Sequence, residues 1–440
     1  MEEQTKLSGR AYIAIGLMLF ALFFGAGNLI FPASMGQQAG ENVWPAVFGF
    51  VVTGVGIPFL GVLAIAYSGC RNAQELSGRV HPLYGIIYTS MLYLTIGPAF
   101  AIPRTGSVSY EIAVRPFLEG GGDQMTYIAT MVAFFGISIW LSISPQKLVE
   151  RIGKVLTPAL LAFILVLVVK SLVTPLGGYG APTEAYVGTN TAVLKGFLEG
   201  YNTLDALAGL VFAILVVDFV KLSGARSKEE ITAATAKTGI VASLCLALVY
   251  IFIANLGATS VEVMGIFPNG APVLAESAKL LFGQAGAVVL AVIVLLACLT
   301  TSIGLITSCA AYFNSSFGGL SYIAYVWLFS VVSFGVALFG LQTIISAAVP
   351  ILMFLYPLTI VIIILAFSHN SFGGRQCVYA WTIGGTFISS LFSGLDTAGI
   401  QVFGPGGYAA LPFHDSGMGW IPFAAVGLAA GLVHKVVVKK

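Results

Sequence analysis

Residues 20–32 read Phe-Ala-Leu-Phe-Phe-Gly-Ala-Gly-Asn-Leu-Ile-Phe-Pro and lie within the first long apolar segment of the chain. Gly25 and Gly27 each cost about 1 kcal/mol relative to alanine in the interior of a helix. Small residues also allow membrane helices to pack closely. Asn28, in the same turn, favours a break, because an amide inside a bilayer needs a hydrogen-bond partner. This stretch therefore predicts a membrane helix that is interrupted near its middle.

The composition indicates a membrane protein. Of the 440 residues, 58% are hydrophobic and 9% are charged, and the mean hydropathy is +0.96. Soluble domains are about 45–50% apolar and about 25% charged, so a soluble fold of this size would lack the polar residues to cover its surface. The net charge of +2 argues against a nucleic-acid partner. The five cysteines form no CxxC motif, which indicates free thiols.

Apolar segments of about 20 residues predict an all-α protein that crosses the lipid bilayer. The sequence contains twelve such segments, at residues 10–38, 43–67, 82–113, 125–143, 152–173, 192–221, 233–256, 284–314, 321–339, 341–367, 376–394 and 418–438. The third segment is the most irregular, because Gly97, Pro98 and Pro103 interrupt it.

The basic residues predict an orientation. With the N-terminus inside, 15 of the 20 Lys and Arg residues fall on the cytoplasmic side, and cytoplasmic loops carry such an excess. One helix more or fewer in the first half would reverse the later loops and remove the bias. We therefore expect a multi-pass protein of the cell (inner) membrane with both termini in the cytoplasm. The loop 221–237 is then inside and the loop 257–283 outside.

A second interruption lies in the sixth segment. Residues 199–209 read Glu-Gly-Tyr-Asn-Thr-Leu-Asp-Ala-Leu-Ala-Gly. Asp205 is the one acidic residue that falls deep in a predicted membrane segment, and an ionisable side chain there indicates a functional site. The alternative is that this helix begins later, so that Asp205 lies in an outer vestibule or caps the helix.

The two interruptions occupy the first and sixth segments. These positions correspond if residues 10–173 and 192–367 are two inverted repeats of five helices, with residues 376–438 forming two peripheral helices. Interrupted helices at matched positions point to the binding site of a transporter. The unwound turns free N–H groups, which bind a carboxylate, and carbonyl groups, which bind an ammonium group or a cation.

The eighth segment offers a possible cation site. Residues 297–304 read Ala-Cys-Leu-Thr-Thr-Ser-Ile-Gly. The two adjacent threonine hydroxyls, with a backbone carbonyl, suit a hard cation such as Na⁺. The alternative is that these hydroxyls bond to carbonyls of their own helix.

Three motifs resemble one family. FFGAGNLIFP at 23–32, GPAFAIPRT at 97–105 and GYNTLDALA at 200–208 are similar to signatures of the branched-chain amino acid:cation symporters, the branched-chain amino acid transport system II carriers. The similarity extends over essentially the whole chain. More distantly, the chain resembles the amino acid–polyamine–cation superfamily, which implies a five-plus-five inverted repeat with broken helices 1 and 6.

The resemblance implies where solute and ion bind. The solute would contact residues at both breaks, namely Gly25, Ala26, Gly27, Asn28, Tyr201, Asn202, Thr203 and Asp205. A sodium ion would lie between the first break and helix eight, at Ala21, Phe24, Ala297, Thr300 and Thr301. No other cofactor is implied.

The chain departs from the related sodium:neurotransmitter symporters in two ways. Asp205 stands where those proteins have a small polar residue, and no arginine follows the Asn28 motif. A second sodium and an outer gating pair are therefore not implied. Arg104 could replace the gate by pairing with Asp396, but we expect it to be an ordinary surface arginine.

The sequence thus predicts Na⁺-coupled uptake of leucine, isoleucine and valine. The alternatives within this class are proton coupling through Asp205, and another amino acid or a nucleobase as substrate. A membrane redox enzyme is disfavoured, because the four histidines fall in loops or at helix ends and show no metal or haem spacing. A channel is disfavoured, because no repeated filter motif is visible.

Overall fold

The structure is a computed structural model that describes residues 9–118, 120, 122–143, 157–400, 402, 412–414 and 416–437. Throughout these residues the regular structure is helical, and they contain no strand. The all-α prediction is confirmed.

The helices follow one another with short connections. In chain order the α-helices are α1 Gly9–Phe23, α2 Ala26–Ala39, α3 Val43–Val51, α4 Ile57–Ser68, α5 Ala73–Gly78, α6 Pro82–Leu94, α7 Ala101–Ala113, α8 Gln124–Ser142, α10 Thr157–Val173, α11 Thr189–Glu199, α12 Asp205–Leu222, α13 Lys228–Met264, α14 Gly270–Phe317, α15 Tyr322–Ala337, α16 Leu341–Phe367, α17 Gln376–Thr397 and α18 Trp420–Val437. Short 3₁₀ and π turns join or extend them, at η1 Gly40–Asn42, η2 Val52–Gly56, η3 Thr95–Ala99, η4 Arg115–Phe117, η8 Glu184–Tyr186 and η9 Gly200–Thr203.

Each of the twelve apolar segments overlaps one or two of these helices; residues 152–156 and 438 lie outside the described residues. By length and composition, the described residues contain seven continuous helical runs able to cross a membrane, or eight with the bent pair Thr189–Thr203 and Asp205–Leu222. One run, Ala26–Ser68, is 43 residues long. At 1.5 Å per residue it would extend roughly 65 Å, twice the hydrocarbon thickness of about 30 Å. Since α2 packs against α3, this run contains two segments that fold back on each other.

The third predicted segment is also interrupted. The π turn η3 joins α6 to α7 and contains Gly97, whose φ of −93° and ψ of −123° are not helical. Pro98 follows directly and lacks an N–H group. Pro103 lies in the first turn of α7, where its missing N–H would have no partner within the helix. The kink therefore starts a new helix just before Arg104.

Small residues bring the central helices close together. A Cβ atom on Gly36 would lie 2.0 Å from the Ala254 carbonyl oxygen, and one on Gly257 would lie 2.2 Å from that of Ala33. The backbones of α2 and α13 therefore touch at two places, as in other membrane bundles. This contact sets the distance between Asn28 on α2 and Tyr250 on α13.

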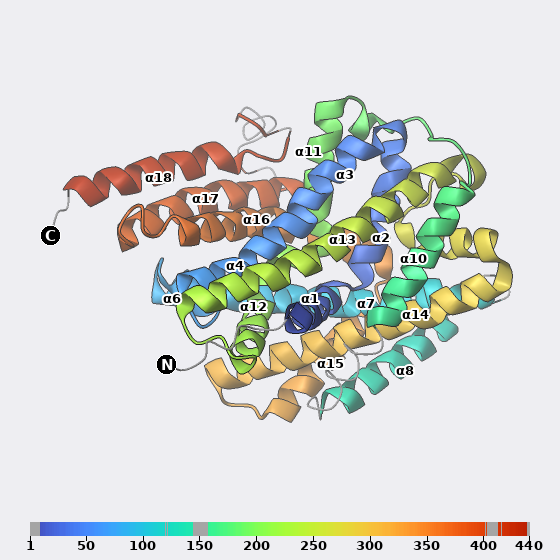
Figure 1. Ribbon diagram of the computed structural model, residues 1–440, viewed down its shortest axis with the longest axis horizontal. Coiled ribbons are helices and arrows are strands. Elements are labelled where there is room, and N and C mark those ends of the chain that lie inside the picture. Colours follow the sequence, from blue (N-terminus) through green and yellow to red (C-terminus); the bar gives the residue numbers. More distant parts are fainter. Residues whose placement is uncertain are drawn as a thin grey trace.

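The remaining helices surround this centre. In Figure 1, α16, α17 and α18 lie side by side in the upper left of the view, and α8, α14 and α15 lie along the lower edge. Within α14, Gly283 has a non-helical φ of +66°, and this kink agrees with the predicted start of the eighth segment at residue 284. The two broken helices pack against each other, α1 on α12 and α2 on α11.

Candidate functional site

The first helix is broken where the glycines predicted. Helix α1 ends at Phe23, and α2 begins at Ala26. The N–H of Gly25 donates a 3.0 Å hydrogen bond to Oδ1 of Asn28, so the Asn28 side chain closes the start of α2. The next N–H groups, at the first turn of α2, have no partner within the helix.

The sixth helix is broken by a residue in an unusual conformation. The turn η9 ends at Thr203, and α12 starts at Asp205 after a bend of 47°. Leu204, between them, has φ of +67° and ψ of 4°, in the left-handed region. A leucine there is costly, and such strain collects at functional sites. The Thr203 hydroxyl donates to the Gly200 carbonyl at 2.9 Å and accepts the Asp205 N–H at 3.3 Å.

The two breaks are joined by one polar cluster. Nδ2 of Asn28 donates to Oδ2 of Asp205 at 2.5 Å and also to the hydroxyl of Tyr250. The Tyr250 hydroxyl in turn donates to the same Oδ2 at 2.8 Å. Asp205 is only 2% exposed. It is therefore buried at the break, neither in an outer vestibule nor acting as a helix cap.

Arg104 corrects the prediction of a surface residue. It is 5% exposed, and its guanidinium donates to the carbonyl of Asn202 at 2.7 Å and to that of Thr203 at 3.4 Å. It also lies over the Phe31 ring, 5.1 Å from the ring centre. Asp396 is not its partner, because that carboxylate contacts His414 at 3.2 Å. The kink at Gly97 directs α7 inward, which the linear pattern did not reveal.

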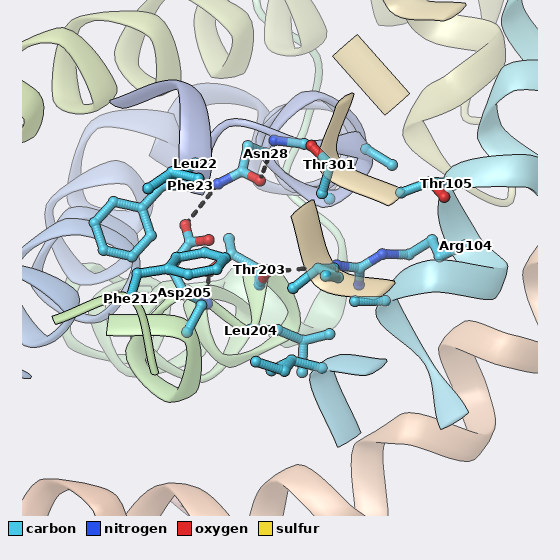
Figure 2. Close-up of a pocket in the computed structure, with 17 residues that line it drawn as sticks. Leu22, Phe23, Asn28, Arg104, Thr105, Thr203, Leu204, Asp205, Phe212 and Thr301 are labelled. Atoms are coloured by element: carbon cyan, nitrogen blue, oxygen red, sulfur yellow. Dashed lines mark hydrogen bonds between the residues drawn. The ribbon is translucent and has the colours of Figure 1, made fainter. Parts of the chain in front are cut away.

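A cavity lies between the breaks (Figure 2). Seven predicted site residues line it: Gly25, Ala26, Gly27, Asn28, Thr203, Asp205 and Thr301. The added polar residues are Arg104 and Thr105. The apolar part of the wall consists of Leu22, Phe23, Ile96, Ala101, Leu204, Ala208, Phe212 and Leu305. Phe23 and Phe212 lie on the Asp205 side of the cavity.

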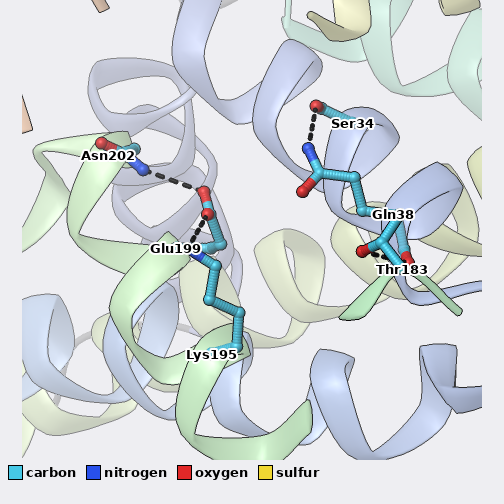
Figure 3. A network of polar contacts seen from close by, with 6 residues as sticks. All are labelled: Ser34, Gln38, Thr183, Lys195, Glu199 and Asn202. Carbon is cyan, nitrogen blue, oxygen red and sulfur yellow. Dashed lines mark hydrogen bonds and ion pairs between the residues drawn. The ribbon is translucent and has the colours of Figure 1, made fainter. Parts of the chain in front are cut away.

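The other two predicted substrate residues point elsewhere. Tyr201 stacks on Tyr356, with ring centres 4.0 Å apart. The Asn202 side chain donates to Glu199 at 2.9 Å. Glu199 also pairs with Lys195, and Figure 3 shows this network beside Gln38 and its partners. Neither Tyr201 nor Asn202 is among the residues that line the cavity. Asn202 contributes to the site through its carbonyl, which accepts from Arg104.

The predicted sodium residues are only partly brought together. The Thr301 hydroxyl faces the carbonyl of Phe24 at 3.4 Å, across the break. Thr300 instead donates to the carbonyl of Ala297 in its own helix at 2.8 Å. Ala21 lies one turn before the break and does not line the cavity as the described residues define it. The oxygens of Thr301 and Phe24 form the part of this set that suits a hard cation, which prefers oxygen ligands.

Sequence reasoning missed Tyr250 and the role of Arg104. Tyr250 lies within a long apolar segment, where nothing in the pattern distinguishes an inward tyrosine from an ordinary packing residue. Arg104 carried a usable signal, because an ionisable residue six positions after a Gly-Pro break is close enough to the break to line it. A buried charge in a membrane helix indicates function by default.

The chain matches the family described as "Branched-chain amino acid transport protein" over residues 8–438. It is 47% identical to the branched-chain amino acid permease BraB of Bacillus subtilis over 423 residues, which cover 96% of this chain and 94% of the permease. It is 38% identical to the branched-chain amino acid transport system 2 carrier protein of Pseudomonas aeruginosa, over 98% of this chain and 97% of the carrier.

Two solved structures share the fold. Mhp1, a nucleobase-cation-symport-1 family transporter in a closed conformation with bromovinylhydantoin bound, gives a TM-score of 0.65 at 15% identity, covering 100% of this chain and 95% of Mhp1. MhsT in complex with L-phenylalanine gives a TM-score of 0.55 at 16% identity, covering 98% of each chain. At this identity the likeness concerns the fold alone.

These findings confirm the predicted family and a membrane transport protein rather than an enzyme. The relatives, which the chain matches over nearly their whole length, are a permease and a carrier, and the helical fold agrees with that of a solved transporter. The chain belongs to the branched-chain amino acid transport protein family.

Proposed function

We propose that this protein takes up leucine, isoleucine and valine across the cell membrane by Na⁺ symport. The observation that carries the proposal is the meeting of two interrupted helices at one cavity, where Asn28 of one break bonds to Asp205 of the other. Interrupted helices that meet in this way form the substrate site of many secondary transporters.

The residues that line the cavity have the chemistry to recognise a branched aliphatic amino acid, and the cavity, at about 30 Å³, has to widen to admit one. Its polar lining includes the N-terminus of α2 and the carboxylate of Asp205, which are complementary to a carboxylate and an ammonium group respectively. Its apolar wall includes Phe23, Phe212 and Leu305, which suit an aliphatic side chain because burial of apolar surface is favourable. The names of the relatives support the same substrate class.

Sodium coupling is supported by the oxygens that face each other across the first break. The Thr301 hydroxyl and the Phe24 carbonyl belong to different helices, α14 and the α1–α2 break. A cation bound between them would link the position of α14 to that of the broken helix. The inward movement of one charge supplies about 2.3 kcal/mol per 100 mV, enough for more than tenfold accumulation at roughly 1.4 kcal/mol per decade.

Proton coupling is the second candidate, and Asp205 is the observation that favours it. Its carboxylate is buried, and its side-chain hydrogen-bond partners, Asn28, Tyr250 and Thr203, are all uncharged. Such a group can carry a proton as well as bind a cation. The two mechanisms differ in the ion whose gradient drives uptake.

The proposed arrangement in the membrane has twelve spanning helices and both termini in the cytoplasm. Residues 10–173 and 192–367 form the two inverted repeats, and residues 376–438 form two peripheral helices. The pairing of the first and sixth helices through Asn28 and Asp205 supports this division. The excess of basic residues in the inner loops supports the orientation.

Uptake of radiolabelled leucine into proteoliposomes tests the proposal. We expect accumulation with an inward sodium gradient and no proton gradient, and inhibition by excess isoleucine or valine but not by lysine or uracil. Accumulation with a proton gradient in sodium-free buffer would favour the second candidate. The absence of leucine uptake under either gradient would contradict both.

A further inference from the structure

Arg104 is a buried charge beside the candidate site that the proposed function does not yet use. Its guanidinium lines the same cavity as Asp205. Both residues lie in the described part of the chain, and no direct ion pair joins them there. Figure 2 shows Asp205 and Arg104 on opposite sides of Thr203, with the guanidinium directed toward the cavity. The cavity therefore has a positive and a negative end.

The hydrogen bonds of Arg104 leave part of the guanidinium available. Nη1 donates to the Asn202 carbonyl and Nη2 to the Thr203 carbonyl. Nε is buried and has no partner among the described residues. An unpaired buried donor costs free energy. A carboxylate is the group that a guanidinium binds best, because the planar fork matches its two oxygens.

A second set of donors lies at the same place. A Cβ atom added to Gly27 would be 2.5 Å from Nη2 of Arg104, so the first turn of α2 and the guanidinium are in close contact. Gly25 already uses its N–H on Asn28. The N–H groups of Ala26 and Gly27 are the ones that the start of a helix leaves without an internal partner. They and Arg104 converge on one region of the cavity wall.

The opposite end carries a complementary acceptor. Asn28 and Tyr250 both donate to Oδ2 of Asp205, and the Thr203 side chain is a third hydrogen-bond partner of this carboxylate. A carboxylate has about four lone-pair sites, so it can accept a further donor. A free amino acid carries one carboxylate and one ammonium group. Its charges match the two ends of the cavity.

We propose that Arg104 is a specificity-determining residue that binds the carboxylate of the transported amino acid, together with the first N–H groups of α2. This inference rests on the proposed function and names the group that recognises one end of its substrate. The competing explanation is that Arg104 only stabilises the carbonyls at the end of η9, as a cation does at a helix C-terminus.

The test compares three ligands in purified protein at saturating sodium. L-leucine has both charges, L-leucinamide lacks the carboxylate, and 4-methylpentanoate lacks the ammonium group. The apparent Kd of each ligand is measured from ligand-dependent thermal stabilisation, which also detects weak ligands at high concentration. In the wild type we expect leucine to bind at least about tenfold more tightly than either analogue.

The variant Arg104→Gln should change this pattern selectively. The leucine Kd should rise about tenfold or more, and the leucinamide Kd should change by less than about threefold. The variant Asp205→Asn is the matched control at the other end, and it should remove the preference for leucine over 4-methylpentanoate instead. An equal weakening of leucine and leucinamide by Arg104→Gln, or no weakening of leucine, would overturn the inference.

Two further measurements make the result decisive. If Arg104→Gln does not fold, Arg104→Lys replaces it, because lysine keeps the charge but loses the planar fork. We expect Arg104→Lys to weaken leucine more than leucinamide, and a proportional change would overturn the proposal. Leucine uptake by the wild type separates the Arg104 inference from the proposed function. If the wild type takes up leucine but the Arg104 variants show no selective effect, only the Arg104 inference fails. If the wild type does not take up leucine, the proposed function fails together with the Arg104 inference.

Discussion

The side-chain amide of Asn28 donates a 2.5 Å hydrogen bond to the carboxylate of Asp205, across 177 residues of sequence. The oxygen of the same amide accepts the N–H of Gly25. One side chain therefore holds the start of α2 and contacts the start of α12. A change in the charge or partners of Asp205 acts directly on the first break, which gives a physical link between the two interrupted helices.

Asp205→Asn tests this link. The variant keeps the shape but removes the charge and the site for a proton. We expect concentrative leucine uptake to fall below a tenth of the wild-type rate. Leucine counterflow, in which no net proton moves, should be lost as well if the carboxylate binds charge. Counterflow that survives would identify Asp205 as a proton carrier, and wild-type uptake would show that it has no role in transport.

Tyr250→Phe removes one donor from the Asp205 carboxylate and one acceptor from Asn28. Hydrogen bonds to charged groups contribute about 1.5–3 kcal/mol, so we expect the half-saturation concentration for leucine uptake to rise about tenfold or more. Tyr84→Phe is the control, since the Tyr84 hydroxyl has no partner among the described residues. If Tyr250→Phe and Tyr84→Phe had the same leucine uptake kinetics, Tyr250 would have no role in leucine binding.

Gly27→Ala tests the close contact between α2 and Arg104. The new methyl group would meet the guanidinium at 2.5 Å, so the Arg104 side chain has to move. We expect leucine affinity to fall about tenfold without a loss of thermal stability, because alanine favours a helix by about 1 kcal/mol over glycine. Gly335→Ala in α15 adds a methyl group into open space, and its leucine affinity should equal that of the wild type.

The orientation in the membrane is tested by cysteine labelling from outside in a cysteine-free background. A cysteine at Ala271 is a poor probe, because this residue is buried. Ile266, in the same loop, is 50% exposed. An impermeant maleimide should modify Ile266→Cys in intact cells, and should modify Glu229→Cys, at the exposed start of α13, only after permeabilisation. The reverse pattern would invert the proposed topology.

The helices were predictable because hydrophobicity alone decides which segments enter a bilayer. The break at Gly25 was predictable for a local reason, since glycines and an amide in one turn disfavour a continuous helix. The break before Asp205 was predictable as a polar cluster. Its detailed form was not, because sequence patterns assign the left-handed conformation to glycine and here Leu204 adopts it.

The contacts across the cavity could not be predicted in the same way. Arg104 was expected at the surface, but the kink at Gly97 turns α7 so that this residue faces the two breaks. Thr300 and Thr301 are adjacent in sequence, and only the structure shows that Thr301 alone faces Phe24. Which side chains face the cavity depends on how each helix is rotated about its axis. The sequence of a uniformly apolar membrane segment does not determine this rotation.

The most direct test of sodium coupling at the first break is a sodium titration of leucine uptake by Thr301→Ala and Thr300→Ala in proteoliposomes. Thr301→Ala removes the hydroxyl that faces Phe24, whereas Thr300 already uses its hydroxyl within its own helix. We expect Thr301→Ala to raise the half-saturating sodium concentration about tenfold or more, with leucine recognition at saturating sodium changed less. Thr300→Ala should have the smaller effect. Sodium dependence that is unchanged in both variants would contradict the proposed sodium site.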